Sequence, residues 1–191
     1  MAYRAVFLDR DGTMNRDVPY CRRPEDFELF PNTARAIKRL NENGYKVIIV
    51  TNQSGVARGY FTEETLARIH QKMRDQLAEG DAHIDGLYYC PHHPLEGRAP
   101  YRLACDCRKP KPGMIHRAVA ELDIDLRHSV MVGDNLSDIK LAENAGIPGV
   151  LVLTGYGRGV LEKLKEEETV KPARIAGDLR ESVAWILHRK G

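Results

Sequence analysis

The sequence lacks any apolar segment long enough to cross a membrane. Its longest aliphatic run covers Val47 to Val50, whereas a transmembrane helix needs about 20 predominantly apolar residues. The start of the chain places charged residues around only four apolar ones, Ala5 to Leu8, which is too short for the apolar core of a secretory signal. We therefore expect a cytoplasmic protein with no membrane partner.

Excess charge of one sign and aromatic side chains are also scarce. The 29 Lys and Arg residues nearly balance 27 Asp and Glu residues, leaving a formal charge of +2, and aromatic residues make up 7% of the chain. A nucleic-acid-binding protein typically presents a strongly basic face with interleaved aromatic residues, so we expect no nucleic-acid partner. No segment of the sequence indicates a large exposed apolar surface that a partner chain would have to cover, which favours a monomer.

Cysteine is limited to four residues. Disulfides rarely persist in a reducing cytosol, so we expect free thiols. Cys90, Cys105 and Cys107 fall close together in one polar segment, whereas Cys21 stands apart. We expect Cys21 to be an ordinary buried or indifferent thiol.

The three clustered cysteines predict a metal site. His92 and His93 follow Cys90 closely, and one residue separates Cys105 from Cys107. Three thiolates and one imidazole complete the closed tetrahedral shell of a structural zinc ion. The spacing leaves open which histidine is the fourth ligand, and the alternative is a set of reduced, metal-free cysteines beside a polar loop.

Short apolar runs alternate with helical patterns along the 191 residues. This alternation is typical of a parallel sheet that helices cover on both faces. The predicted strands are Ala5 to Leu8, Val47 to Val50, Leu87 to Cys90, Val130 to Val132 and Val150 to Leu153. The predicted helices are Thr33 to Asn43, one that begins at Thr62, Gly113 to Leu122, Ser137 to Ala145 and Arg180 to His188. We predict a single domain, residues 1–191, with an α/β, Rossmann-like three-layer fold around a central, mostly parallel sheet.

Two long polar segments with several prolines interrupt the alternation, Asn15 to Pro31 and Pro91 to Pro112. Connections of this length inside a compact domain are usually functional or held by special contacts. Neither is long enough for a separate cap domain. We expect the binding site to be shaped by these segments, the second of which is stapled by zinc, and by the loop near residues 53–61.

Polar motifs directly follow three predicted strands. They are Asp9-Arg10-Asp11-Gly12-Thr13, Thr51-Asn52-Gln53-Ser54-Gly55 and Gly133-Asp134-Asn135-Leu136-Ser137-Asp138. Because the carboxyl ends of strands in an open α/β sheet face one crevice, Asp9, Asp11 and Asp134 are expected to lie close together there. Crowded carboxylates require a cation or a shared proton, and Mg²⁺ prefers oxygen ligands. The second motif offers neutral donors to a phosphate. Each motif alone is compatible with an ordinary polar turn, but three at successive strand ends favour a binding site.

A rigid basic segment, Arg108-Lys109-Pro110-Lys111-Pro112, follows the cysteine cluster. A lysine held by stiff backbone can meet a transferring phosphoryl group as a fixed positive charge. The alternative is a solvated basic turn. The position directly after the expected metal site favours function, because bound zinc would hold the loop that presents Arg108 and Lys109.

Taken in order, Asp9-x-Asp11-Gly12-Thr13, Thr51, Lys109 and Gly133-Asp134-x-x-x-Asp138 resemble the motifs of the haloacid dehalogenase superfamily of phosphohydrolases. The resemblance implies that Asp9 is the nucleophile and that Asp11 is the general acid and base. It also implies that Thr51 and Lys109 steady the phosphoryl group. Mg²⁺ would then be bound by Asp9, by the backbone carbonyl of Asp11 and by Asp134, with Asn135 adjacent to the metal.

Within this superfamily, the cysteine and histidine segments are similar to those of sugar-bisphosphate phosphatases. That similarity implies zinc ligands at Cys90, His92, Cys105 and Cys107. It implies substrate contacts from Asp17, Val18, Pro19, Tyr20, Asn52, Gln53, Ser54 and Arg108. The alternative is a histidinol-phosphate phosphatase, whose loop between the zinc-binding arms is shorter than the twelve residues that separate His92 from Cys105 here.

Overall fold

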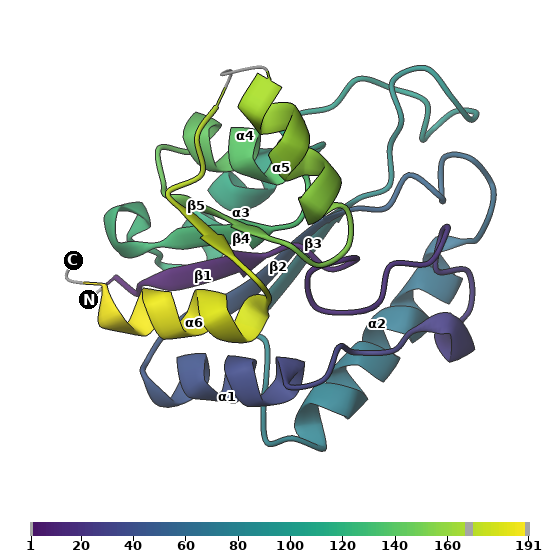
Figure 1. Ribbon diagram of the computed structural model, residues 1–191. Helices are drawn as coiled ribbons and strands as arrows, with labels where there is room; N and C mark the ends of the chain where they lie inside the picture. Colours follow the sequence, from purple (N-terminus) through teal and green to yellow (C-terminus); the bar gives the residue numbers. More distant parts are fainter. Residues whose placement is uncertain (1, 167–169, 190–191) are drawn as a thin grey trace.

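One parallel sheet of six strands runs through the computed structural model, which describes residues 2–166 and 170–189 (Figure 1). The strands are β1 (Ala5–Leu8), β2 (Lys46–Asn52), β3 (Gly86–Cys90), β4 (Val130–Gly133), β5 (Gly149–Val152) and β6 (Arg174–Ala176). Their order across the sheet is β3-β2-β1-β4-β5-β6, and every neighbouring pair is parallel. The α/β fold with a central parallel sheet is therefore confirmed.

Helices cover both faces of the sheet. They are α1 (Thr33–Glu42), α2 (Glu63–Ala78), α3 (Gly113–Leu122), α4 (Leu136–Asn144), α5 (Gly157–Glu166) and α6 (Leu179–His188). Figure 1 shows α1, α2 and α6 on one side and α3, α4 and α5 on the other, which gives the three layers. No helix among residues 2–166 and 170–189 has both the length and the apolar character needed to cross a membrane.

Successive side chains of β1 point to opposite faces of the sheet, which explains why its run of apolar residues forms a central strand. Val6 and Leu8 pack into the core on the α1 and α6 side, whereas Ala5 and Phe7 pack on the α3 and α4 side. All four are completely buried. A strand with helices over both faces needs an apolar residue at every position, which is the pattern that the sequence has.

Local signals account for the ends of several helices. The hydroxyl of Thr62 accepts a hydrogen bond from the backbone N–H of Thr65 at 3.1 Å and caps the start of α2. After α1, Gly44 has a φ of +73°, a left-handed conformation that glycine adopts without steric cost. Pro112 lies at the residue just before α3 rather than inside its first turn.

Two elements, β6 and α5, were not predicted by apolar periodicity. β6 has only three residues at the edge of the sheet, and just Ala176 is buried. α5 begins with two glycines, Gly157 and Gly159, which have poor helix propensity. A Cβ atom at Gly157 would lie 1.7 Å from the carbonyl oxygen of Val152, so close packing against β5 excludes a larger residue there.

The strand order reverses between β1 and β4, which neighbour each other at the centre of the sheet. In open α/β sheets such a reversal leaves a crevice outside the carboxyl ends of the two strands. Asp9 directly follows β1, and Asp134 directly follows β4. The topology therefore brings together two acidic residues that are far apart in the sequence.

We predict that truncating a central core side chain destabilises the fold strongly. Phe7→Ala should lower the free energy of unfolding by about 3–5 kcal/mol, because it removes a buried aromatic ring and leaves a cavity. The control is Leu95→Ala, since Leu95 is 74% exposed, and its effect should stay within about 0.5 kcal/mol. Urea unfolding of both variants gives the comparison, and equal effects would contradict the packing described for β1.

Candidate active site

A cavity of about 590 Å³ opens at the carboxyl ends of the central strands. It brings together all of the residues for which the sequence predicted catalytic, magnesium-binding or substrate-binding roles. These are Asp9, Asp11, Asp17, Val18, Pro19, Tyr20, Thr51, Asn52, Gln53, Ser54, Arg108, Lys109, Asp134 and Asn135. The individual roles remain predictions, but residues spread over the chain from position 9 to position 135 share one site.

The ammonium group of Lys109 lies between two carboxylates at the base of the cavity. Its Nζ is 2.7 Å from Oδ1 of Asp9 and 2.7 Å from Oδ1 of Asp138. All three side chains are almost completely buried. Burial acts to lower the pKa of Lys109, but the charges of Asp138 and Asp9 outweigh it and hold the pKa above its usual range. Lys109 is therefore a fixed positive charge beside Asp9.

The carboxylates at this end of the sheet are crowded. Asp9, Asp134 and Asp138 each place an oxygen within 4.8 Å of the others. Burial raises the pKa of Asp134, and repulsion from Asp9 and Asp138 raises it further. Burial also raises the pKa of Asp9 despite the contact with Lys109. Lys109 offsets only part of this negative charge, so the donor set fits a divalent cation that prefers oxygen, such as Mg²⁺.

Two glycines leave room for the carboxylate of Asp134. A Cβ atom at Gly12 would lie 2.2 Å from its Oδ2, and one at Gly155 would lie 2.1 Å from the same atom. Both glycines have positive φ, +80° and +52°. That Oδ2 accepts a hydrogen bond from the backbone N–H of Tyr156 at 2.8 Å. Asp134 is therefore held by backbone that approaches more closely than a side chain would allow.

Asp11 is held away from Lys109 by three other residues. Arg10 Nη2 lies 2.7 Å from its Oδ2, Gln53 Nε2 donates to the same oxygen at 2.8 Å, and Asn15 Nδ2 donates to Oδ1 at 3.0 Å. Burial acts to raise the pKa of Asp11, but Arg10 and these hydrogen bonds outweigh it and leave the pKa below its usual range. This arrangement favours the ionised form of Asp11.

Three predicted site residues also make hydrogen bonds that build the site itself. Asn52 Nδ2 donates to the backbone carbonyl of Lys109 at 3.2 Å, and its Oδ1 accepts from the backbone N–H of Lys109 at 3.0 Å. Gln53 Nε2 donates to the hydroxyl of Thr51 at 2.9 Å. Oδ1 of Asn135 accepts from the backbone N–H of Ser137 at 3.2 Å and caps α4. These amide groups position the backbone and side chains around the cavity.

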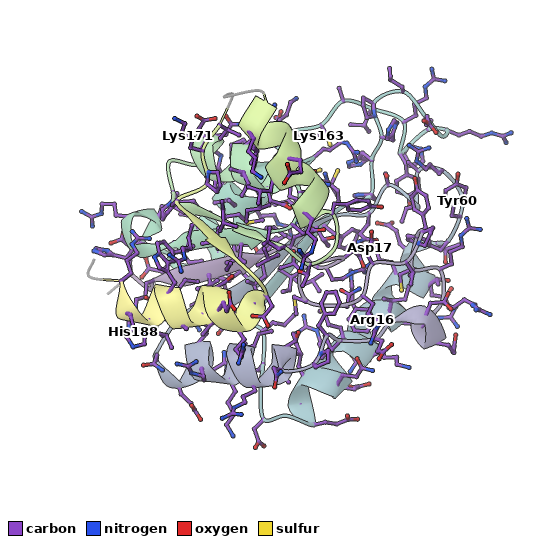
Figure 2. The ribbon with its side chains drawn as sticks, viewed as in Figure 1. Arg16, Asp17, Tyr60, Lys163, Lys171 and His188 are labelled. Atoms are coloured by element: carbon purple, nitrogen blue, oxygen red, sulfur yellow. The ribbon has the colours of Figure 1, made fainter. Side chains whose placement is uncertain are left out.

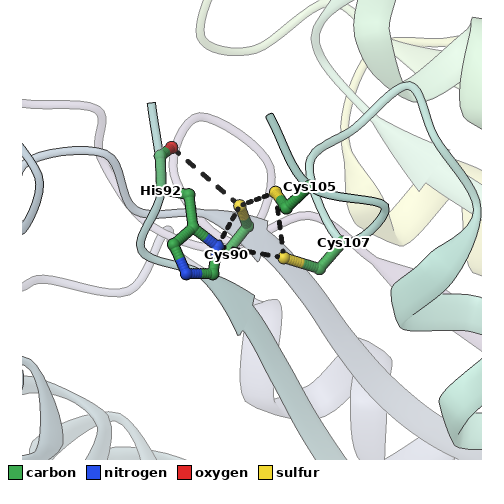
Figure 3. A group of neighbouring side chains, drawn as sticks. All are labelled: Cys90, His92, Cys105 and Cys107. Carbon is green, nitrogen blue, oxygen red and sulfur yellow. Dashed lines mark hydrogen bonds between the residues drawn. The ribbon is translucent and has the colours of Figure 1, made fainter. Parts of the chain in front are cut away.

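The predicted zinc-binding side chains gather above β3 (Figure 3). Cys105 Sγ lies 3.5 Å from that of Cys90 and 3.3 Å from that of Cys107. Nδ1 of His92 lies 3.4 Å from the sulfur of Cys107 and 3.8 Å from that of Cys90. A tetrahedral zinc ion with the usual bond lengths separates neighbouring ligand atoms by roughly 3.5–3.8 Å. The four side chains therefore fit zinc, and their sulfur atoms are too far apart for disulfides.

His93 has a different position. Its Nδ1 accepts hydrogen bonds from the backbone N–H groups of Leu95 and Glu96 at 3.3 and 2.9 Å. Burial, together with the nearby positive charges of Arg108 and Arg58, holds the pKa of His93 below its usual range. A neutral His93 fastens the loop, which leaves His92 as the histidine that faces the three sulfur atoms.

The structure adds residues to the site that the sequence did not assign to it. Tyr156 lines the cavity from the loop between β5 and α5. Asp17, which is labelled in Figure 2, lines the same cavity. Cys21 also lines the cavity, and burial raises the pKa of its thiol to about 11. A thiol with such a pKa is a poor nucleophile at neutral pH. No motif surrounds Tyr156, so only its conformation reveals its place.

Comparisons with known proteins agree with this geometry. A family model described as HAD-hydrolase-like matches residues 106–182. A D-glycero-beta-D-manno-heptose-1,7-bisphosphate 7-phosphatase from Vibrio cholerae is 44% identical over 190 residues, and the match covers 100% of both chains. The protein of that name from Haemophilus ducreyi is 48% identical over 157 residues, which is 81% of this chain and 86% of the relative.

A solved structure is similar as well. The crystal structure of D,D-heptose 1,7-bisphosphate phosphatase from B. bronchiseptica, complexed with magnesium and phosphate, superposes with a TM-score of 0.85 at 36% identity. The match covers 96% of this chain and 98% of that one. The similarity therefore extends over the sheet and over the long loops that surround the cavity.

We predict that the cysteine cluster binds about one zinc ion per chain and that the ion stabilises the fold. Cys107→Ser should abolish stoichiometric zinc in the purified protein and lower its Tm by about 4–8 °C, the shift for a loss of about 2 kcal/mol in a chain of this size. Cys21→Ser is the matched control and should keep the zinc. Elemental analysis and thermal unfolding measure both effects, and full zinc occupancy in Cys107→Ser would contradict the assignment.

Proposed function

We propose that this chain, which belongs to the D-glycero-D-manno-heptose-1,7-bisphosphate 7-phosphatase family of HAD-like hydrolases, is a phosphoric monoester hydrolase that removes the 7-phosphate of that sugar. The observation that carries the proposal is similarity to such phosphatases along the whole chain. The cavity supports the proposal, because acidic, cationic and neutral hydrogen-bonding groups line it together. We place the reaction in the synthesis of nucleotide-activated heptose for lipopolysaccharide or S-layer glycans.

In the first step of the proposed reaction, a carboxylate oxygen of Asp9 attacks the phosphorus atom. The new bond joins phosphorus to Asp9, and the bond between phosphorus and the sugar oxygen breaks. Asp11 gives its proton to the departing sugar oxygen. Attack by a carboxylate divides one difficult hydrolysis into two easier displacements.

In the second step, water attacks the phosphorus atom of the aspartyl phosphate. Asp11 takes a proton from that water, inorganic phosphate leaves, and the carboxylate of Asp9 is restored. Arg10 and the hydrogen bonds to Asp11 favour its ionised form, which this second step requires. An incoming phosphate dianion repels its carboxylate and raises its pKa, which favours the protonated form needed for the first step.

Asp9, Asp134 and the backbone carbonyl of Asp11 would hold Mg²⁺, with Asn135 adjacent. When bound, the ion supplies positive charge to the oxygens of the transferring phosphoryl group. Lys109 supplies a second positive charge beside Asp9, since its Nζ lies 2.7 Å from Oδ1 of Asp9. Thr51, whose hydroxyl accepts a hydrogen bond from Gln53, offers its own hydroxyl hydrogen to a phosphate oxygen.

Arg108 suits the second phosphate of a bisphosphate substrate. It lines the cavity, and one of its nitrogens, Nη1, donates to the backbone carbonyl of His92 at 3.2 Å. The remaining guanidinium N–H groups can bind a phosphate in bidentate fashion. Since Lys109 and Mg²⁺ serve the transferring phosphate, Arg108 gives the substrate's other phosphate a partner.

Replacing the nucleophile tests the mechanism. Asp9→Asn should lower turnover by at least about 10³-fold, because an amide cannot form the acyl phosphate. Thermal unfolding should show a folded protein, since Asp138 still pairs with Lys109 and the change reduces repulsion among the buried carboxylates. Asp81→Asn, which removes an exposed carboxylate that pairs with Lys38 and does not line the cavity, should keep normal turnover. Substantial residual activity of Asp9→Asn would argue against the role.

Parallel phosphate-release assays test the substrate. The wild type should hydrolyse the heptose bisphosphate, supplied as both anomers, far better than histidinol phosphate. Arg108→Ala should lower kcat/KM for the bisphosphate about tenfold to a hundredfold more than for heptose 7-phosphate, the cost of a lost charged hydrogen bond. A preference for histidinol phosphate would overturn the proposed function, and an equal loss on both sugar phosphates would remove Arg108 from the second phosphate.

A further inference from the structure

Three loops form the rim of the cavity, and one side chain of the second loop reaches the other two. The first loop covers residues 15–31, the second 53–61 and the third 91–112. Arg58 belongs to the second loop. Its guanidinium carbon lies 5.9 Å from the centre of the Tyr20 ring in the first loop. In the third loop it forms an ion pair with Glu96, and its Nη2 lies 3.4 Å from Nε2 of His93.

The environment of Arg58 indicates that these contacts between loops determine its position. Only 21% of its side chain is exposed. Its Nε is buried and has no hydrogen-bond partner among the described residues. A buried N–H group without a partner lowers stability, so this placement does not optimise hydrogen bonding. Instead, the guanidinium group of Arg58 lies near the ring of Tyr20 and also contacts side chains of the third loop.

Tyr20 is the rim residue that depends on this support. It lines the cavity, and its φ of +56° is uncommon for a bulky residue. Tyr60 of the second loop meets its ring edge-on, with centroids 4.6 Å apart. Arg22 lies over the other ring of this pair, 4.6 Å from the centre of Tyr60. Side chains of the second loop therefore contact Tyr20, whose backbone conformation is unusual.

The second loop is itself fixed to the third loop, which carries the cysteine cluster. The backbone N–H of Ala57 donates to the carbonyl of Pro91 at 3.2 Å. A Cβ atom at Gly97 would lie 2.0 Å from the carbonyl oxygen of Ala57, so the two backbones pack in direct contact. Arg58 extends this fixed pair of loops to the ring of Tyr20.

We propose that Arg58 is a positioning residue, which sets the place of Tyr20 and thereby the width of the cavity that receives the sugar chain. It acts through Tyr20, because Arg58 itself is not among the described residues that line the cavity. The substrate class follows from the proposed function, on which this inference rests. Loss of Arg58 should therefore weaken selection for the sugar chain more than it weakens phosphate transfer.

The test compares Arg58→Gln, Arg58→Lys and Glu96→Gln with a matched control. In α3, Arg117 also pairs with a glutamate, Glu121 at 2.7 Å, and lies 5.5 Å from the centre of a tyrosine ring. Arg117→Gln removes the same kinds of contact away from the rim. For each variant, kcat and KM are measured with the heptose bisphosphate and with p-nitrophenyl phosphate, which has no sugar chain.

The ratio of kcat/KM for the bisphosphate to that for p-nitrophenyl phosphate should fall about tenfold in Arg58→Gln, mainly through a higher KM for the sugar. Arg58→Lys and Glu96→Gln should each lower the ratio about threefold, because lysine lacks the planar fork and glutamine lacks the charge. Arg117→Gln should keep the ratio within about twofold. An unchanged ratio in the Arg58 and Glu96 variants that fold would overturn the proposal.

Hydrogen exchange gives a second readout that needs no substrate. Backbone amides of residues 16–23 should exchange at least about tenfold faster in Arg58→Gln than in the wild type or in Arg117→Gln, because the first loop loses a restraint. Unchanged exchange there would overturn the positioning role. A wild type without activity on the bisphosphate would instead overturn the proposed function, and the role of Arg58 would then be decided by exchange alone.

Discussion

The buried ion cluster around Lys109 is the interaction on which the rest of the site depends. An ammonium group in this position would be unfavourable without Asp9 and Asp138, and the carboxylates would repel one another without it. The three side chains come from the loop after β1, the segment before α3 and the first turn of α4. Their mutual compensation places carboxylates and an ammonium group together in a largely buried environment, where electrostatic interactions are strongest.

The segment that carries Cys90, His92, Cys105 and Cys107 supports this cluster at a distance. Cys107 lies two residues before Lys109, so an ion bound by the four side chains would restrain the backbone that carries the ammonium group. Asn52 completes the restraint by bonding both the N–H and the carbonyl of Lys109. Positioning from two sides matters because a lysine side chain is long and flexible, and an ordered charge needs no reorganisation when the substrate arrives.

Much of the fold and of the site was predictable because the signals are local. Apolar runs indicated β1 to β5, and polar motifs at strand ends indicated Asp9, Thr51 and Asp134. Other features depend on contacts that no local pattern encodes. The edge strand β6 is too short to show an alternation of apolar and polar residues. Tyr156 reaches the cavity only through the conformation of its loop. The bonds of Asn52 to the backbone of Lys109 join residues 57 positions apart, so composition alone could not reveal them.

The position of β1 between β2 and β4 has a consequence for how the chain matures during translation. Asp9 and Lys109 are separated by 100 positions, and β4 begins only at Val130. While the ribosome is still making the middle of the protein, β1 has an open edge on one side and an acidic side chain with no counter-ion at its end. Such an edge invites pairing with other chains, and distant pairing makes folding slow. We therefore expect this edge of β1 to stay unpaired until the residues of β4 have been made.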